Sequence, residues 1–197
     1  MADLKGLSYQ SEVSWEDVFA LWQEHEGTRE DWQQVAKEKG WPSWAEWRDA
    51  WVGNFDAQNR KWKRYVIDHP LEMVPTFRVG PTQAWQRNFP EEESNQHTFA
   101  YLVERVSYEQ NKKVRALLEN FPSPSEFIGI LMPDKSITAI EGHHRATALA
   151  LAVQQGRDMI FQQLPTIVLT EFRSGEEELL GKMLQRGSHN HKYLWNQ

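Results

Sequence analysis

Tryptophan is concentrated at the start of the chain, and this feature constrains the fold most. Seven of the ten tryptophans in this 197-residue chain lie at or before position 51. They fall in three segments, and each segment opens with a hydroxyl residue three positions before a carboxylate, at Ser14, Thr28 and Ser43. This spacing is typical of a capping box at a helix N-terminus. The pattern predicts three short helices over residues 14–52, separated by glycines.

Each predicted helix carries its tryptophans on one face, as Trp15, Val18 and Trp22 do at helical spacing in the first. A unit of this size has little interior, and large aromatic side chains bury the most area per residue. We therefore expect residues 1–55 to form an all-α, tryptophan-rich three-helix unit with most tryptophans in its core. The alternative is that some of them form a face that binds a protein partner, because aromatics are common interface anchors. The sequence does not separate these two.

Residues 56–97 are irregular, with prolines at positions 70, 75, 81 and 90. We interpret them as a linker that becomes a strand or two near residues 73–79. The segment also contains the only basic cluster, residues 60–64. In a chain of formal charge −6, such a cluster is more typical of an ordinary surface than of a nucleic-acid site.

The remainder alternates helical and strand patterns. Apolar residues recur at helical spacing over residues 98–121, in one broken helix or two. Two apolar runs, 126–132 and 136–141, are joined by a predicted turn at residues 133–135. A helix is expected from Gly142 to about Gln155, a strand at 164–172, and a last helix at 176–186 followed by a tail. These elements predict an α+β fold, with a small mixed sheet and flanking helices over residues 65–175 and a C-terminal segment at 176–197.

The junction between the second of these strands and the following helix reads Glu141-Gly142-His143-His144-Arg145. The first N–H groups of a helix have no internal acceptors and carry the positive end of the helix dipole, so they bind anions. Glycine allows a close approach to the backbone, and arginine offers a fork of donors that matches phosphate. His143 and His144 add further donors and can exchange protons near neutral pH. The sequence therefore predicts a phosphate site at this turn.

This junction, with the following Ala-Thr-Ala-Leu, resembles the signature turn of the ParB and sulfiredoxin-like superfamily over residues 65–172. Within that superfamily, the turn is most similar to the Asp-Gly-His-His-Arg motif of the ADP-dependent free serine kinases. This chain has Glu141 where that motif has the aspartate. The resemblance implies ATP or ADP with Mg²⁺ as cofactor and an upstream glutamate as base. Glu72 is the candidate for that base, as the only carboxylate in an early strand-like stretch with proline neighbours.

The chain departs from two other branches of that superfamily. Sulfiredoxins carry a catalytic cysteine after the glycine, whereas this chain has His143 there and no cysteine at all, which excludes repair of sulfinic acids by that route. Partitioning ParB proteins carry Gly-Glu-Arg-Arg and a following DNA-binding domain. The acidic charge argues against both DNA clamping and nuclease activity.

Three function classes remain, and the charge balance disfavours the third, a nuclease, because its phosphate turn would have to face a basic groove. In the first, the chain is a Mg²⁺-dependent phosphotransferase or nucleotidase in which Gly142, His143, His144 and Arg145 bind the phosphates, while Glu141, His143 or Glu72 act in catalysis. In the second, the turn holds a nucleotide or phosphometabolite without turnover. A protein-bound zinc ion is not expected, because adjacent histidines point in different directions and no third ligand has suitable spacing.

The chain contains no apolar run of about 18 residues, the length that a membrane-spanning helix needs. Its N-terminus also lacks the apolar stretch of a secretory signal. We therefore expect a soluble, cytoplasmic protein without a membrane partner.

Overall fold

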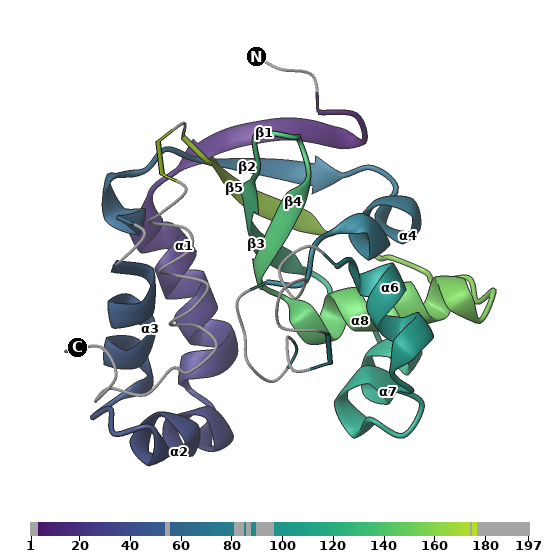
Figure 1. Cartoon of the computed structure of the whole chain (residues 1–197), viewed down its shortest axis with the longest axis horizontal. Helices are drawn as coiled ribbons and strands as arrows, with labels where there is room; N and C mark the ends of the chain where they lie inside the picture. The colour runs from purple at the N-terminus through teal and green to yellow at the C-terminus, as the bar shows by residue number, and fades with distance from the viewer. Residues whose placement is uncertain are drawn as a thin grey trace.

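The computed structural model describes residues 4–53, 56–80, 85, 88–89, 97–173 and 175–176. Its centre is a five-stranded mixed sheet in the order β1-β2-β5-β3-β4. β3 and β5 are parallel, and the other neighbours are antiparallel. Figure 1 shows two groups of helices beside this sheet, α1–α3 and α6–α8. The predicted α+β class with flanking helices is confirmed. The strands are β1 (Leu7–Val13), β2 (Trp62–Ile67), β3 (Glu126–Leu131), β4 (Ile137–Glu141) and β5 (Thr166–Glu171).

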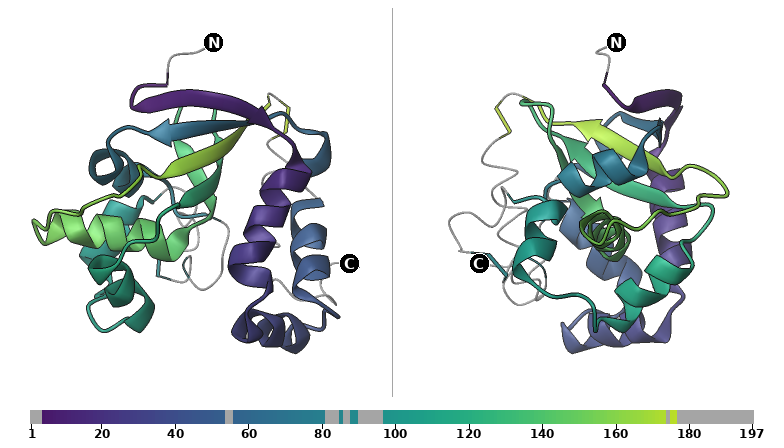
Figure 2. Two further views of the ribbon diagram at one scale, coloured as in Figure 1. Left: turned by 180° about the vertical axis from the view of Figure 1, so that it is seen from behind. Right: turned by 90° about the vertical axis from the view of Figure 1, so that its right-hand side faces the viewer.

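The two faces of the sheet bury two different hydrophobic clusters, because successive side chains of a strand point to opposite faces. Phe127 and Leu131 of β3 join one cluster, which includes residues of the helices α6, α7 and α8. Ile128 and Ile130 join the other, which includes the tryptophans of the first helices. All six residues of β3 are buried, as expected for a strand covered on both faces. The sheet is thus the middle layer between the two groups of helices (Figure 2).

The predicted tryptophan-rich helices are present as α1 (Trp15–Trp22), α2 (Glu30–Glu38) and α3 (Trp44–Gly53). A π-helical segment, η1 (Gln23–Gly27), follows α1 directly. Of the six tryptophans before residue 51, whose side chains the structure describes, five are buried. This confirms the core interpretation for Trp15, Trp22, Trp41, Trp44 and Trp47. Each buried tryptophan removes roughly 150–250 Å² from water. That is worth about 4–6 kcal/mol before the entropy cost of ordering the chain is subtracted.

Two of the three predicted hydroxyl N-caps are confirmed. The hydroxyl of Ser14 accepts a hydrogen bond from the Asp17 N–H, and that of Ser43 accepts one from the Glu46 N–H, both at 3.1 Å. The N-cap predicted at Thr28 is wrong, because Arg29 is the N-cap of α2 and the Thr28 hydroxyl donates to the Glu24 carbonyl. The π-helical turn before Thr28 displaces the start of the next helix, and local spacing does not reveal such a turn.

The segment before the first helix is not helical, which corrects the prediction of an all-α unit over residues 1–55. β1 pairs antiparallel with β2 and forms an edge of the sheet. Most of its side chains are exposed or half-buried, so it lacks the apolar alternation that marks a half-buried strand. The ladder with β2 holds it instead. The helices α1–α3 also share their core with Ile128, Ile130 and Val168 of the sheet.

Residues 56–80 differ from the predicted linker. They contain the strand β2, the short helices η2 (Ala57–Asn59) and α4 (Pro70–Met73), and the turn η3 (Val74–Thr76). The strand predicted near residues 73–79 is wrong, apart from isolated bridges at Arg78. The basic cluster, residues 60–64, covers the two residues before β2 and the first part of that strand. Three of its members form ion pairs with acidic residues. Those pairs are Arg60 with Glu176, Lys63 with Glu171 and Arg64 with Glu126.

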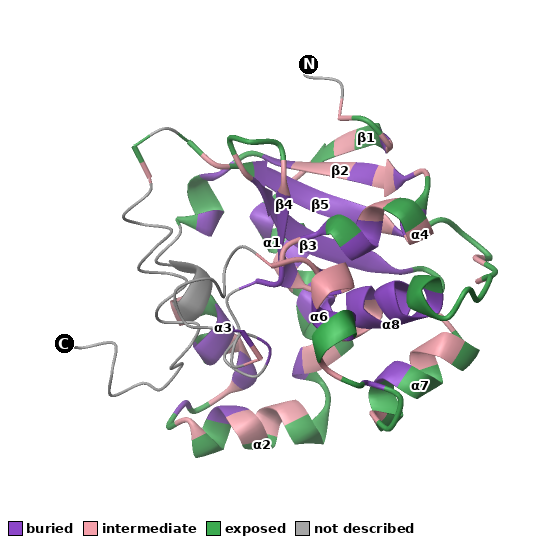
Figure 3. Ribbon diagram, turned by 45° about the vertical axis from the view of Figure 1, so that its right-hand side comes forward, coloured by how far each residue is buried: buried purple, intermediate pink, exposed green. Residues whose placement is uncertain are grey.

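The second half follows the prediction closely. Residues 98–121 form two helices, α6 (Phe99–Arg105) and α7 (Lys112–Glu119), with Asn111 rather than Ser107 capping the second. β3 and β4 form the predicted hairpin, and α8 (His143–Gln154) follows at once. Figure 3 shows α8 buried along much of its length. The helix predicted at 176–186 and the tail lie outside the described residues, apart from Glu176 itself.

None of the helices in the described part of the chain is both long and apolar enough to cross a bilayer.

Candidate functional site

The turn between β4 and α8 is shaped by one glycine. Gly142 has a φ of 101°, which L residues rarely adopt, and a Cβ placed there would lie 2.3 Å from the Cδ1 atom of Phe127. The backbone geometry and this ring therefore both require glycine. The first hydrogen bond of the helix runs from the Ala146 N–H to the Gly142 carbonyl. The N–H groups of residues 143–145 precede it, in the positions that bind anions in other helices.

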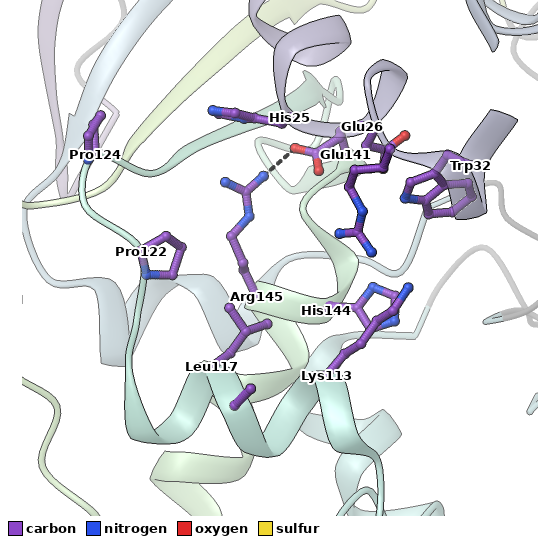
Figure 4. A pocket seen from close by; sticks show the side chains of 12 residues that line it. His25, Glu26, Trp32, Lys113, Leu117, Pro122, Pro124, Glu141, His144 and Arg145 are labelled. Carbon is purple, nitrogen blue, oxygen red and sulfur yellow. Dashed lines mark hydrogen bonds and ion pairs between the residues drawn. The ribbon is translucent and has the colours of Figure 1, made fainter.

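A cavity of about 410 Å³ opens beside this turn (Figure 4). The turn contributes Glu141, His144 and Arg145 to its lining. The opposite wall comes from the N-terminal helices, through His25, Glu26, Arg29 and Trp32. α7 and the loop after it complete the lining with Lys113, Ala116, Leu117, Pro122 and Pro124. Elements far apart in the sequence therefore meet around the predicted phosphate site.

Arg145 is held in place by several contacts. Its guanidinium donates to the Glu141 carboxylate and, over 3.2 Å, to the Ser125 hydroxyl. Its Cζ atom lies 5.1 Å from the centre of the Phe127 ring. The side chains of Arg145 and Glu141 are 11% and 12% exposed. A fixed guanidinium with a face toward the cavity is suited to binding an oxyanion, because its donors are already oriented.

Glu141 is a half-buried carboxylate next to this cation. Burial raises the pKa of Glu141, and the charge of Arg145 opposes that shift. The carboxylate of Glu26 raises the pKa of Glu141 further, so the two acids face a common space. A carboxyl group whose pKa is moved upward by burial is suited to accepting a proton in catalysis.

His144 faces the large cavity and carries no charge near neutral pH. Burial lowers the pKa of His144 to about 4, and the positive charges of Lys113, Arg29 and Arg145 add to this shift. The ring also meets Trp85 edge to face, with the centroids 5.0 Å apart. As a neutral imidazole, it has one N–H donor and one acceptor.

His143 points away from the large cavity. Its ring stacks on Trp85 at 5.6 Å and meets the edge of Phe99 at 5.8 Å. It lines a second, smaller cavity of about 80 Å³, together with Trp22, Arg48 and Gly142. The roles predicted for His143 in phosphate binding and catalysis therefore gain no support from the large cavity, because neighbouring residues of a helix project about 100° apart.

The position of His143 predicts a pH dependence of stability. Burial lowers the pKa of His143 to about 3, so between pH 6.5 and that value the unfolded chain binds a proton that the folded chain excludes. Above pH 6.5 the neutral His143 does not reduce the free energy of unfolding. As the pH decreases from 6.5 toward 3, the free energy of unfolding falls by about 1.4 kcal/mol per pH unit. In His143→Phe this part of the loss should be absent. Urea unfolding at pH 7, 6, 5 and 4 compares the two proteins, and parallel curves would contradict the placement.

Glu72, the predicted upstream base, lies elsewhere. It is an exposed residue of α4 and lines neither cavity. Its segment is a helical turn rather than the strand on which the prediction depended. In the part of the chain that the structure describes, no three His, Cys, Asp or Glu residues form a metal-binding group.

The sequence interpretation missed one whole wall of the site. His25 and Glu26 belong to the π-helical segment, and such segments are rare and often occur at functional sites. Trp32 and Lys113 come from the helices α2 and α7, and Arg29 is the N-cap residue just before α2. No local pattern connects these residues with the turn, since only the packing of α1–α3 against the sheet brings them together.

Comparisons of the chain with protein-family models, with curated proteins and with solved structures gave no match.

Proposed function

We propose that this chain binds a nucleotide or another small phosphate-bearing molecule, with a phosphate at the start of α8. The observation that carries this proposal is the convergence of donors from three separate elements on one cavity. Arg145 and His144 come from the turn, Arg29 from the N-terminal helices and Lys113 from α7. Three of these residues, Arg145, Arg29 and Lys113, are cations, and they share the lining with the carboxylates of Glu26 and Glu141. Because the chain has a net charge of −6, this grouping of cations is a feature of the site and not of the composition.

The cavity also suits the rest of such a ligand. Its volume of about 410 Å³ falls among those typical of small-molecule sites, roughly 300–1,000 Å³. Trp32, Leu117 and Pro122 provide an apolar wall beside the cations. A planar group such as a base can stack on an indole and gain burial there. The proposed ligand therefore has an anionic end and a flat or apolar end.

For the reaction, we propose phosphate transfer or hydrolysis with ATP or ADP and Mg²⁺, in which Glu141 accepts the proton of the attacking group. Its burial and raised pKa support this role, as does the resemblance of the turn to that of ADP-dependent free serine kinases. Mg²⁺ takes oxygen ligands, commonly one or two carboxylates in addition to phosphates. The carboxylate of Glu26 lines the same cavity as Glu141 and fits that requirement, which leaves Glu141 as the base. Bound Mg²⁺ would neutralise phosphate charge.

Binding is tested by the shift of the melting temperature with phosphate, ADP and ATP, each with and without Mg²⁺. A ligand at about 100 times its Kd adds about 2.7 kcal/mol of stability, which raises the melting temperature by several degrees. The double variant Glu141→Gln/Arg145→Met removes the guanidinium without leaving a buried charge unpaired, and it should lose the shift. Arg157→Met, an exposed arginine just after α8, is the control and should keep it.

Two outcomes separate the alternatives. Product formation from ATP or ADP that is lost in Glu141→Gln supports the enzyme. Binding without product identifies a module that holds the ligand without turnover. If no phosphate compound changes the melting temperature, or if the double variant responds as the original chain does, the proposed site is wrong.

A further inference from the structure

Two cations that line the cavity, Arg29 and Lys113, are joined by the acidic side chain of Asp31. We call these three residues the rim of the cavity. Asp31 lies in the first turn of α2. Its carboxylate accepts two hydrogen bonds from the Arg29 guanidinium, at 2.7 and 3.0 Å. The Lys113 ammonium of α7 donates to the same carboxylate over 3.3 Å. Asp31 itself does not line the cavity, although both of its partners do.

This carboxylate links two parts of the molecule that are far apart in the sequence. The Lys113 ammonium also lies 5.6 Å from the centre of the Trp32 ring. Lys113 of α7 therefore contacts α2 twice, through the carboxylate of Asp31 and through the ring of Trp32. Arg29 and Lys113 lie close enough to His144 to lower its pKa. The charges of Arg29 and Lys113 therefore reach the turn, and Asp31 is the anion that pairs with both of them.

We propose that Asp31 controls which anions the cavity accepts, by holding Arg29 and Lys113 until a second anionic group of the ligand replaces its carboxylate. This inference rests on the proposed phosphate site. A single phosphate at the start of α8 is served by Arg145 and His144 alone. A ligand with two adjacent anionic groups can also reach the rim, where it competes with Asp31.

The strength of the rim contacts is compatible with such a replacement. The side chains of Arg29, Asp31 and Lys113 are each 48–49% exposed. Ion pairs that are this exposed are weak and are screened by salt, so a phosphate can displace one. A dianionic phosphate group also offers more acceptor oxygens to both cations than one carboxylate does. Selectivity then depends on a small difference in free energy between two states, in which either Asp31 or the ligand pairs with Arg29 and Lys113. A single substitution can change that difference.

The test compares Asp31→Asn with the original chain by calorimetric titration with pyrophosphate and with inorganic phosphate. Removing the charge should increase the affinity for pyrophosphate by about two- to tenfold, which corresponds to one or two exposed ion pairs. The affinity for inorganic phosphate should change less. The gain should shrink at about 0.5 M salt, where the screening length is only a few ångströms.

Two matched variants make the result specific. Glu30→Gln removes the same charge one residue away, at an exposed position of α2, and should leave both affinities within about twofold. Adding Lys113→Met to Asp31→Asn should abolish most of the gain. A purely structural role of Asp31 would instead weaken binding when the residue is changed.

The inference is overturned if Asp31→Asn binds pyrophosphate no better than Glu30→Gln does, while the original chain still binds phosphate at the turn. It is overturned together with the proposed function if none of these proteins binds either anion.

Discussion

Gly142→Ala is expected to lower the free energy of unfolding by between about 2 and 6 kcal/mol. A non-glycine residue in a sparsely populated backbone region costs about 1–3 kcal/mol, and overpacking a filled core costs a similar amount. Both costs apply, because Gly142 has a φ of 101° and its added Cβ would lie 2.3 Å from the Phe127 ring. Equilibrium unfolding in urea measures the change.

Gly156→Ala is the matched control for this substitution. Gly156 follows the other end of α8 with a φ of 62°, and an added Cβ there would have no neighbour within 4 Å. Only the backbone cost of about 1–2 kcal/mol applies at that position. Equal losses in the two variants would show that the contact with Phe127 does not matter. The comparison also shows why Gly142 is not by itself evidence for a ligand: the fold already requires a glycine there.

Arg48→Met is expected to cost about 3–5 kcal/mol, because it leaves Glu26 partly buried and without its ion pair. Arg48 is 7% exposed, and its guanidinium lies 2.9 Å from the Glu26 carboxylate. Its Cζ atom is also 4.1 Å from the ring centre of Trp47 and 5.0 Å from that of Trp22. The substitution therefore removes the ion pair and the contacts between the cation and the rings. Urea unfolding gives the loss.

A second substitution distinguishes the ion pair from general packing. In Glu26→Gln/Arg48→Met no charge is left unpaired, so most of the stability should return. Arg29→Met breaks an exposed pair instead and should change stability by no more than about 1 kcal/mol. A double variant as unstable as Arg48→Met would mean that the aromatic contacts, rather than the charge, carry the effect. Because Glu26 lines both cavities, the Arg48 variant should also weaken ligand binding.

The parts of the fold that could be predicted are those with strong local signals. A local signal within about ten residues predicts each of these elements. The signal is a turn for the β3–β4 hairpin, a glycine for the start of α8, and a capping serine for the helices α1 and α3. β1 could not be predicted, because an edge strand with exposed side chains has no buried face to impose a pattern. The segment around Glu72 was misassigned since its prolines fit a helical turn as well as a strand boundary.

The residues of the candidate site also differ in whether a local signal predicts them. Glu141, His144 and Arg145 could be predicted, because one turn contains them all. The cations opposite them could not, since Lys113 and Arg29 reach the cavity only through long-range packing. His143 and His144 are neighbours in the chain and both line the smaller cavity, yet only His144 also lines the larger one, and the sequence provides no means to decide which one faces the ligand.

The most direct measurement is a titration of the isotope-labelled protein with inorganic phosphate, followed through the backbone amide signals by NMR. If a phosphate sits at the start of α8, the amide signals of residues 143–145 should show the largest changes, and they should saturate together with that of the Arg145 side chain. Gly156, beyond the other end of the same helix, should remain unchanged. No saturable change at residues 143–145, or larger changes elsewhere on the chain, would contradict the proposed phosphate site.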